Sequence, residues 1–184
     1  MDYYLEIRVL PDPEFSTVAL LEALYAKLHR ALGNAGQGRI GVSFPAAGKT
    51  LGDRLRLHGS LAALTEFEQQ PWRKGLRDYT EHSGIRPIPE QVKFRTVRRV
   101  QVKSNAERLR RRSVAKGWLT QEQARERIPT AREQRCSLPF IRLKSLSSEQ
   151  VFLLFIEQGT LRDTPTVGQY SAYGLSATAT IPWF

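Results

Sequence analysis

The spacing of apolar residues switches between that of a strand and that of a helix several times within the first seventy residues, and the order of these switches limits the possible folds. Apolar and polar residues alternate over 3–10, 39–44 and 54–58, which predicts three strands. Helical spacing over 15–32, and again after Ser60, predicts two helices. The order strand, helix, strand, strand, helix fits most of a ferredoxin-like domain.

A further strand is predicted over residues 92–103. It would complete the ferredoxin-like domain or open a second unit. Its even positions are largely apolar and its odd positions carry basic and amide side chains, so alternation predicts one basic face that includes Arg99, Gln101 and Lys103.

Two helices are predicted after this strand. Ser104 and Glu107 have the spacing of a capping box, which predicts a helix over 105–116 that ends at Gly117. Its basic residues share one face at spacings of three and four: Arg108, Arg111, Arg112 and Lys116. A second capping pattern at Thr120 predicts a short helix that ends at Pro129.

The remaining chain has the pattern of strands over 140–145, 150–157, 170–175 and 180–184. The fold class predicted is therefore α+β. We expect a ferredoxin-like domain over 1–92 and a second, mixed α/β domain over 93–184 that carries the arginine-rich helix.

The positive charge of the chain is concentrated in one segment. The net charge is +10, and residues 93–116 hold ten Lys or Arg side chains and one acid. A dense block of like charge repels itself, so a polyanionic partner explains it better than a solvated surface does. Seven of the ten are arginines, whose planar guanidinium suits phosphate oxygens. Charge alone leaves DNA and RNA open, although ferredoxin-like folds favour RNA.

Several classes of protein do not fit the sequence. No apolar run is long enough to span a bilayer, and the first residues lack the pattern of a secretory signal. Cys136 is the single cysteine, and no Cys/His group has zinc-ligand spacing. We therefore expect a cytoplasmic protein with no metal and no cofactor.

The histidines are the available groups for acid–base chemistry. His29 lies at the edge of the apolar stripe of the first helix, where a histidine is typically structural; His58 lies in a strand and His82 in a polar loop. If the protein cuts RNA, a histidine could deprotonate a ribose 2′-hydroxyl that attacks the adjacent phosphate.

Short blocks along the whole chain resemble the CRISPR RNA-processing endoribonuclease family of type I-F systems. They occur in the same order as in that family: Lys27–Leu32, Arg39–Pro45, Arg99–Gln101, Lys103–Asn105, Glu107–Arg112, Leu138–Phe140, Tyr173–Ser176 and Pro182–Phe184. The resemblance implies cleavage of repeat RNA at the 3′ base of its hairpin without a metal, leaving a 2′,3′-cyclic phosphate and retaining the hairpin. It also implies that 93–184 is the RNA-binding domain and that other subunits of the interference complex are partners.

The resemblance implies a role for individual residues. His29 would be the general base, Ser145 would hold the nucleophilic ribose, and Tyr173 would orient the histidine. Arg99 and Gln101 would contact base edges near the foot of the stem, and Phe152 would stack on the terminal base pair. Without the resemblance, the residue types alone favour structural roles for Ser145, Tyr173 and Phe152.

Two positions depart from the family pattern. Ala115 stands where further arginines are expected, and Leu146 stands where a polar residue is expected. Neither departure removes the three catalytic candidates. The alternative function is a non-catalytic subunit that binds an RNA hairpin through the same basic helix and uses His29 structurally.

Overall fold

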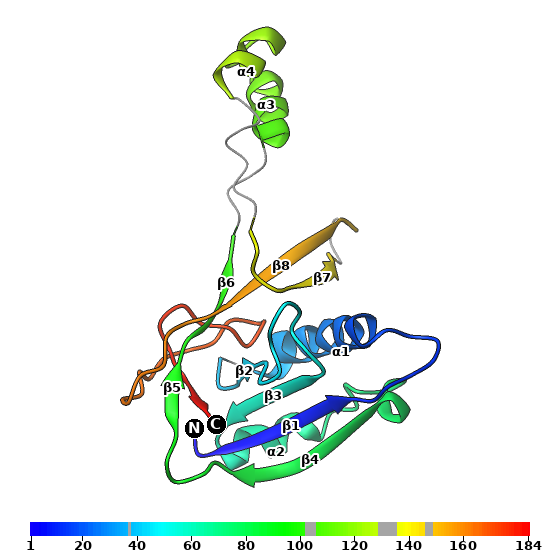
Figure 1. Cartoon of the computed structure of the whole chain (residues 1–184), viewed down its shortest axis with the longest axis vertical. Helices are drawn as coiled ribbons and strands as arrows, with labels where there is room; N and C mark the ends of the chain where they lie inside the picture. Colours follow the sequence, from blue (N-terminus) through cyan, green and yellow to red (C-terminus); the bar gives the residue numbers. More distant parts are fainter. Residues whose placement is uncertain (37, 102–105, 129–135, 146–148) are drawn as a thin grey trace. The chain divides into compact units, whose positions relative to one another are not determined.

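The structure is a computed structural model that describes residues 1–36, 38–101, 106–128, 136–145 and 149–184. These residues pack as two compact units, of which one joins Met1–Arg99 to Leu138–Phe184 and the other is Val100–Ser137 (Figure 1). The packing therefore changes near residues 99 and 138 rather than at residue 92, because the strands after Leu138 return to the N-terminal unit. The RNA-binding role of 93–184 stays a prediction.

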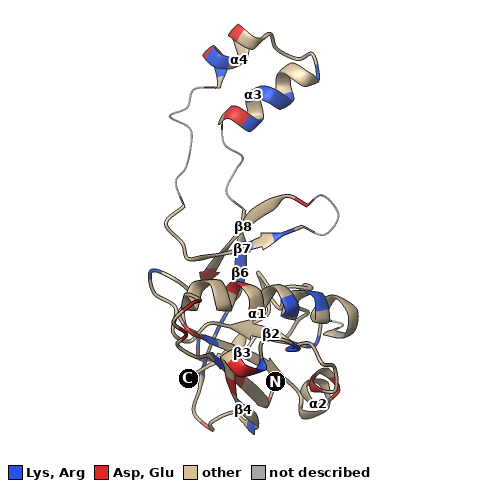
Figure 2. Ribbon diagram, turned by 90° about the vertical axis from the view of Figure 1, so that its right-hand side faces the viewer, with Lys and Arg blue, Asp and Glu red and all other residues tan. Residues whose placement is uncertain are grey.

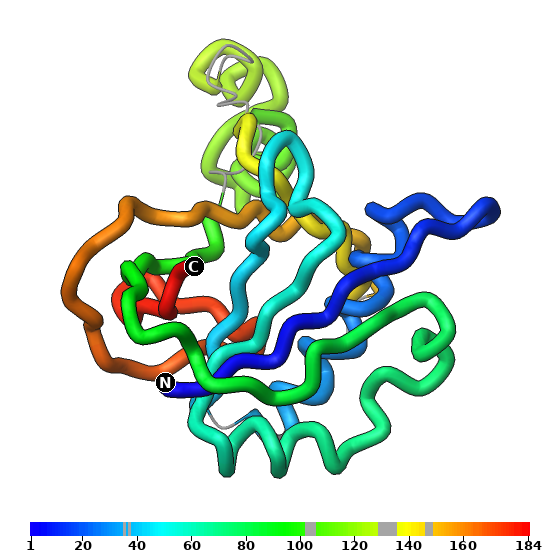
Figure 3. The backbone as a smooth tube through the Cα atoms, turned by 60° about the horizontal axis from the view of Figure 1, so that its bottom comes forward, coloured from blue at the N-terminus to red at the C-terminus, as the bar shows by residue number. Residues whose placement is uncertain are grey.

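The larger unit begins with a β-α-β-β-α-β succession. Its elements are β1 (Tyr3–Val9), α1 (Thr17–Ala31), β2 (Gly41–Ser43), β3 (Arg54–Gly59), α2 (Leu61–Glu68) and β4 (Thr80–Pro87). A π-helical turn, Leu32–Gly36, follows α1, and a 3₁₀ turn, Arg77–Tyr79, precedes β4. The strand order is β2-β3-β1-β4 with antiparallel neighbours, so that β1 lies between β3 and β4 (Figure 3). This is the ferredoxin-like arrangement of elements.

The two helices start at serine caps and bury one apolar side against the sheet. The side chains of Ser16 and Ser60 accept hydrogen bonds from backbone amides in the first turns of α1 and α2. Alternate residues of β1, including Leu5 and Ile7, are fully buried and belong to the same core as Leu24 of α1. The core therefore fixes the rotation of α1 about its axis, and with it the residues at the edge of its buried side.

The strand that completes this sheet is β4, not the strand predicted from Val92. His82 accordingly lies on β4 and not in a loop. The segment after Val92 forms two strands, β5 (Lys93–Arg95) and β6 (Val97–Val100), in different sheets. The single basic strand face predicted over 92–103 is therefore wrong, and residues 102 and 103 lie outside the described residues.

The C-terminal strands build two small sheets. β5 pairs with β9 (Ile181–Trp183), and the second sheet has the order β6-β8-β7, with β7 at Phe140–Lys144 and β8 at Val151–Gln158. The strand predicted over 170–175 is wrong, because that segment forms a turn. The fold class is α+β, as predicted. No helix in the described part of the chain is long and apolar enough to cross a membrane.

The smaller unit contains α3 (Ala106–Ala115) and α4 (Gln121–Arg127), which pack against each other. Gly117 ends α3 in a left-handed conformation (φ +68°), with the amides of Gly117 and Trp118 donating to the carbonyls of Val114 and Ser113. Thr120 and Gln123 form the predicted capping box of α4. The other predicted capping residue, Ser104, lies outside the described residues. In Figure 2 part of the α3 ribbon has the blue colour of Lys and Arg residues.

Candidate active site

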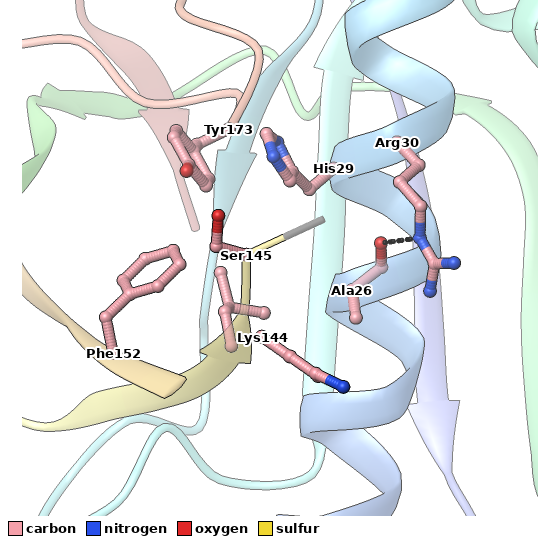
Figure 4. Close-up of a pocket in the computed structure, with 8 residues that line it drawn as sticks. Ala26, His29, Arg30, Lys144, Ser145, Phe152 and Tyr173 are labelled. Carbon is pink, nitrogen blue, oxygen red and sulfur yellow. Dashed lines mark hydrogen bonds between the residues drawn. The ribbon is translucent and has the colours of Figure 1, made fainter. Parts of the chain in front are cut away.

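A cavity of about 490 Å³ lies in the larger unit, between α1, the β7–β8 hairpin and the turn around residue 173. It brings together four residues that were predicted for the site although they lie far apart in the sequence: His29, Ser145, Phe152 and Tyr173. Figure 4 shows the side chains of His29, Tyr173 and Ser145 directed toward a common space, with Phe152 next to Ser145. The remaining lining residues are Ala26, Arg30, Leu143 and Lys144.

His29 is held in a defined orientation by the turn that carries Tyr173. The two rings stack with centroids 3.9 Å apart and planes 5° apart. His29 Nδ1 lies 2.9 Å from the carbonyl oxygen of Ala172. A carbonyl oxygen only accepts hydrogen bonds, so Nδ1 carries a proton in this contact. In the neutral imidazole the lone pair is then on Nε2.

The turn itself is fastened to α1 and to β2. The buried hydroxyl of Tyr25, one helical turn before His29, donates to the carbonyl oxygen of Tyr173 at 2.8 Å. Burial raises the pKa of Tyr25 well above its ordinary value, with a smaller contribution from Tyr173, so the hydroxyl stays protonated and remains a donor. The amide of Val42 on β2 donates to the carbonyl oxygen of Gly174 at 2.8 Å. The position of the Tyr173 ring thus follows from two hydrogen bonds, one to the carbonyl oxygen of Tyr173 itself and one to that of Gly174.

Ser145 and Phe152 reach the cavity from the β7–β8 hairpin. Phe152 is paired with Leu143 in the antiparallel register, and the amide of Ser145 donates to the carbonyl oxygen of Gln150 at 2.9 Å. Glu22 of α1 accepts a hydrogen bond from the amide of Arg142 on β7 at 2.9 Å. This bond links the strand that leads into Ser145 to the helix that carries His29.

Arg99 lies beside the cavity and is the last residue of the N-terminal segment of the larger unit. Its guanidinium carbon is 5.8 Å from the ring centroid of Phe152 and 5.9 Å from that of Tyr173. The preceding residue, Arg98, instead forms two hydrogen bonds with the carboxylate of Glu157. The two neighbouring arginines therefore have different surroundings, and Arg99 is the one that contacts two aromatic rings of the cavity.

The other residues predicted to bind RNA belong to the smaller unit or lie outside the described residues. Gln101, Arg111 and Arg112 are exposed in the smaller unit, as is Arg108 of α3. Lys116, also exposed, lies with its ammonium 4.7 Å from the ring centroid of Trp118. Lys103 and Leu146 are outside the described residues. Ala115 is exposed at the end of α3.

The other two histidines lie away from this cavity. His58 is fully buried in β3, its Nε2 is 2.8 Å from the hydroxyl oxygen of Ser43, and its Nδ1 has no described partner. Burial, followed by the charge of Arg56 and of the N-terminus, lowers the pKa of His58 to about 3. It is therefore neutral at physiological pH. His82 is exposed on β4. Among the described residues, no group of three or more His, Cys, Asp or Glu side chains could hold a metal ion.

Sequence reasoning missed several residues that complete the site. Arg30 and Lys144 line the cavity, while Tyr25 and Glu22 hold its walls together. Tyr25 lies on the buried stripe of α1, where it resembles any core aromatic, and Glu22 has no periodicity that marks it. Arg30 and Lys144 carried a signal, since Arg30 directly follows His29 and Lys144 directly precedes Ser145 in the sequence.

Comparison with known proteins identifies the family. Residues 4–184 match the family model described as CRISPR-associated protein (Cas_Csy4). A relative named CRISPR-associated endonuclease Cas6/Csy4, from Escherichia coli (strain UTI89 / UPEC), is 62% identical over 184 residues, covering all of both chains. A relative of the same name from Pseudomonas aeruginosa (strain UCBPP-PA14) is 45% identical over 187 residues, again covering both chains. The resemblance noted in the sequence blocks is thereby confirmed, and the chain belongs to the Cas_Csy4 family of CRISPR-associated proteins.

Proposed function

We propose that this protein is an endoribonuclease that cleaves CRISPR repeat RNA at the 3′ base of its hairpin, without a metal, and keeps the hairpin. The names of its full-length relatives, which are CRISPR-associated endonucleases, support the general activity. The observation that carries the mechanism is the orientation of His29. Its Nδ1 is bound to the Ala172 carbonyl, so the neutral ring presents Nε2 as a base within the same cavity as Ser145.

The proposed reaction is an internal transfer within the RNA. Nε2 of His29 takes the proton of the ribose 2′-hydroxyl, and the 2′ oxygen forms a bond to the adjacent phosphorus. The bond from phosphorus to the 5′ oxygen of the next nucleotide breaks, and that oxygen takes a proton from water. The products are a 2′,3′-cyclic phosphate on the hairpin and a 5′-hydroxyl on the released strand.

The other residues bind and orient the substrate in this proposal. Ser145 holds the attacking ribose, and Tyr173 keeps the imidazole in place through the stacked contact at 3.9 Å. Phe152 stacks on the last base pair of the stem, and Arg99 contacts a base edge beside it. Further RNA contacts come from polar and basic residues near or in the second unit: Gln101, Lys103, Arg108, Arg111, Arg112 and Lys116.

The partners in this proposal are the repeat hairpin and the other subunits of the type I-F interference complex. A cytoplasmic location, expected from the sequence, stays a prediction. A non-catalytic hairpin-binding subunit is the alternative, and it would use the same basic helix.

Cleavage of a repeat RNA in EDTA separates the two functions. We expect cleavage in EDTA, a cyclic phosphate on the product, and no cleavage when the nucleotide on the 5′ side of the cut carries a deoxyribose. Intact RNA that is tightly bound would support the non-catalytic subunit instead.

The histidine is tested by His29→Ala, with His82→Ala as the matched control on an exposed position of β4. We expect His29→Ala to lower the single-turnover rate by about two to four orders of magnitude at nearly unchanged affinity. His82→Ala should retain both rate and affinity. If His29→Ala weakens binding as much as it slows cleavage, the histidine is structural.

A further inference from the structure

The active-site cavity extends beyond the three catalytic candidates toward a basic end. Apart from His29, its ionisable lining residues are Arg30 of α1 and Lys144 of β7, together with the phenol of Tyr173. Figure 4 shows Lys144 reaching toward α1, on the side of Ser145 away from Phe152, and Arg30 on α1 itself. No Asp or Glu is among the described lining residues. This end of the cavity thus presents two cations.

Both basic groups are able to bind an anion in the positions that they occupy in the structure. Nε of Arg30 donates to the carbonyl oxygen of Ala26 at 2.9 Å, which fixes the guanidinium along α1 while its two terminal amino groups have no partner among the described residues. Lys144 pairs with Glu149 at 3.8 Å, but the two side chains are 62% and 82% exposed, so this ion pair is weak. The one acid within α1, Glu22, accepts a hydrogen bond from the amide of Arg142. The site therefore carries positive charge that the protein neutralises only in part.

We propose that Arg30 and Lys144 form a phosphate-binding subsite for the RNA strand on the 3′ side of the cut. This inference rests on the proposed function, in which the stem ends at Phe152 and the scissile phosphate lies near His29 and Ser145. The strand that leaves the cut on the side opposite Phe152 then passes Arg30 and Lys144. The recognised group is the phosphodiester backbone, so the subsite is indifferent to base sequence.

Such a subsite acts on the substrate and not on the retained product. Contacts with the 3′ strand exist before the bond from phosphorus to the 5′ oxygen breaks, and after cleavage that strand is no longer joined to the hairpin. The subsite therefore raises affinity for the uncleaved RNA and allows the released strand to dissociate, while the hairpin stays bound by its own contacts.

The test compares two repeat RNAs, one that ends a single nucleotide past the cut and one that continues for five more. Cleavage rates are measured with protein below saturation. We expect the longer RNA to be cleaved roughly ten-fold faster, because it adds phosphate contacts. Raising the salt concentration should shrink this advantage, with a log–log slope of about 0.7 for each contact. In the double variant Arg30→Met/Lys144→Met, the two RNAs should be cleaved at rates within about two-fold of each other.

Arg142→Met is the matched control, since Arg142 is an exposed cation on the same strand that does not line the cavity. It should keep the advantage of the longer RNA. A full advantage in the double variant, or none in the unaltered protein, overturns the subsite. If neither RNA is cleaved, the proposed function fails. The subsite is then decided by binding of the same two RNAs with a deoxyribose at the cut: equal affinities refute it, and a preference for the longer RNA that the double variant loses supports it.

Discussion

Gly174→Ala tests whether the turn behind His29 is fixed by close packing. Gly174 has a φ of +69°, in the left-handed region, and follows the residue whose ring stacks on His29. A Cβ placed on it would overlap Cγ2 of Val42, lie 3.0 Å from Cβ of the same residue and 3.3 Å from Cδ1 of Leu32. Val42 is β-branched and fully buried in β2, so it cannot give way by changing rotamer.

The expected loss of stability has two parts. A left-handed backbone costs alanine about 1–2 kcal/mol. Forcing a methyl group into a packed site costs about 1–3 kcal/mol more. Gly75→Ala is the matched control, because Gly75 has a similar φ of +78° but an added Cβ would meet no described atom within 4 Å. Gly75→Ala should show only the backbone cost, so the difference between the two variants, about 1–3 kcal/mol, measures the close approach.

Urea denaturation followed by circular dichroism measures both free energies of unfolding. Gly174→Ala should also slow RNA cleavage, because relief of the overlap moves Tyr173 from its stacked position, whereas Gly75→Ala should not. Equal destabilisation by the two substitutions would refute the packing argument. A destabilised Gly174→Ala protein that cleaves at the full rate would refute the dependence of the site on this turn.

Three further predictions address the buried histidine and the RNA contacts. His58 has a pKa of about 3 in the folded protein against an ordinary value near 6.5, so unfolding takes up a proton between these values and stability falls as the pH is lowered below about 6.5. At about pH 5 the free energy of unfolding should be about 2 kcal/mol lower than at neutral pH, which urea denaturation can measure. The same flat dependence of stability on pH in the unaltered protein and in His58→Gln would contradict this prediction. Arg99→Ala should cost about 1–3 kcal/mol of RNA affinity and relax base preference at one stem position, whereas Arg98→Ala, which removes a partner of Glu157, should not; a uniform loss across stem sequences would make Arg99 a phosphate contact. Arg111→Ala should reduce the salt dependence of RNA binding by a log–log slope of about 0.7–0.9, and an unchanged slope would exclude a phosphate contact there.

The elements that sequence patterns predict well are those with one buried face. β1 alternates because its odd residues enter the core, and α1 shows its stripe for the same reason. β4 was missed because it lies at the edge of the sheet and only Thr80 among its residues is buried, so it has no apolar alternation to detect. At 170–175, by contrast, the sequence pattern predicted a strand that the structure does not have. Tyr170 and Leu175 are buried there, but they reach the core from a turn and not from a strand.

The site was less predictable than the fold, because its geometry depends on contacts across the whole chain. The position of His29 at the stripe edge is visible in the sequence, yet that position alone favours a structural role. Ser145 and Tyr173 lie more than 110 residues away along the chain, and no local pattern places them beside it. Only the resemblance to a family brought the three residues together before the structure did.

The arrangement of the cavity also means that the proposed chemistry requires both ends of the chain. The core holds α1, so His29 is presented by a rigid element, but among the described residues the hydrogen-bond partner and the stacked ring of its imidazole come from the last 50 residues. The Ala172 carbonyl fixes its Nδ1, and the Tyr173 ring covers one face of the imidazole. The turn that carries them is held by the N-terminal part of the chain, because Tyr25 donates to the carbonyl of Tyr173 and β2 donates to the carbonyl of Gly174. The two ends thus stabilise each other's geometry, and the imidazole of His29 acquires its orientation only when the C-terminal segment has folded onto the N-terminal sheet. The dense positive charge of α3 belongs to the other compact unit, so in the proposed function the attraction of RNA and its cleavage depend on separately packed parts of one chain.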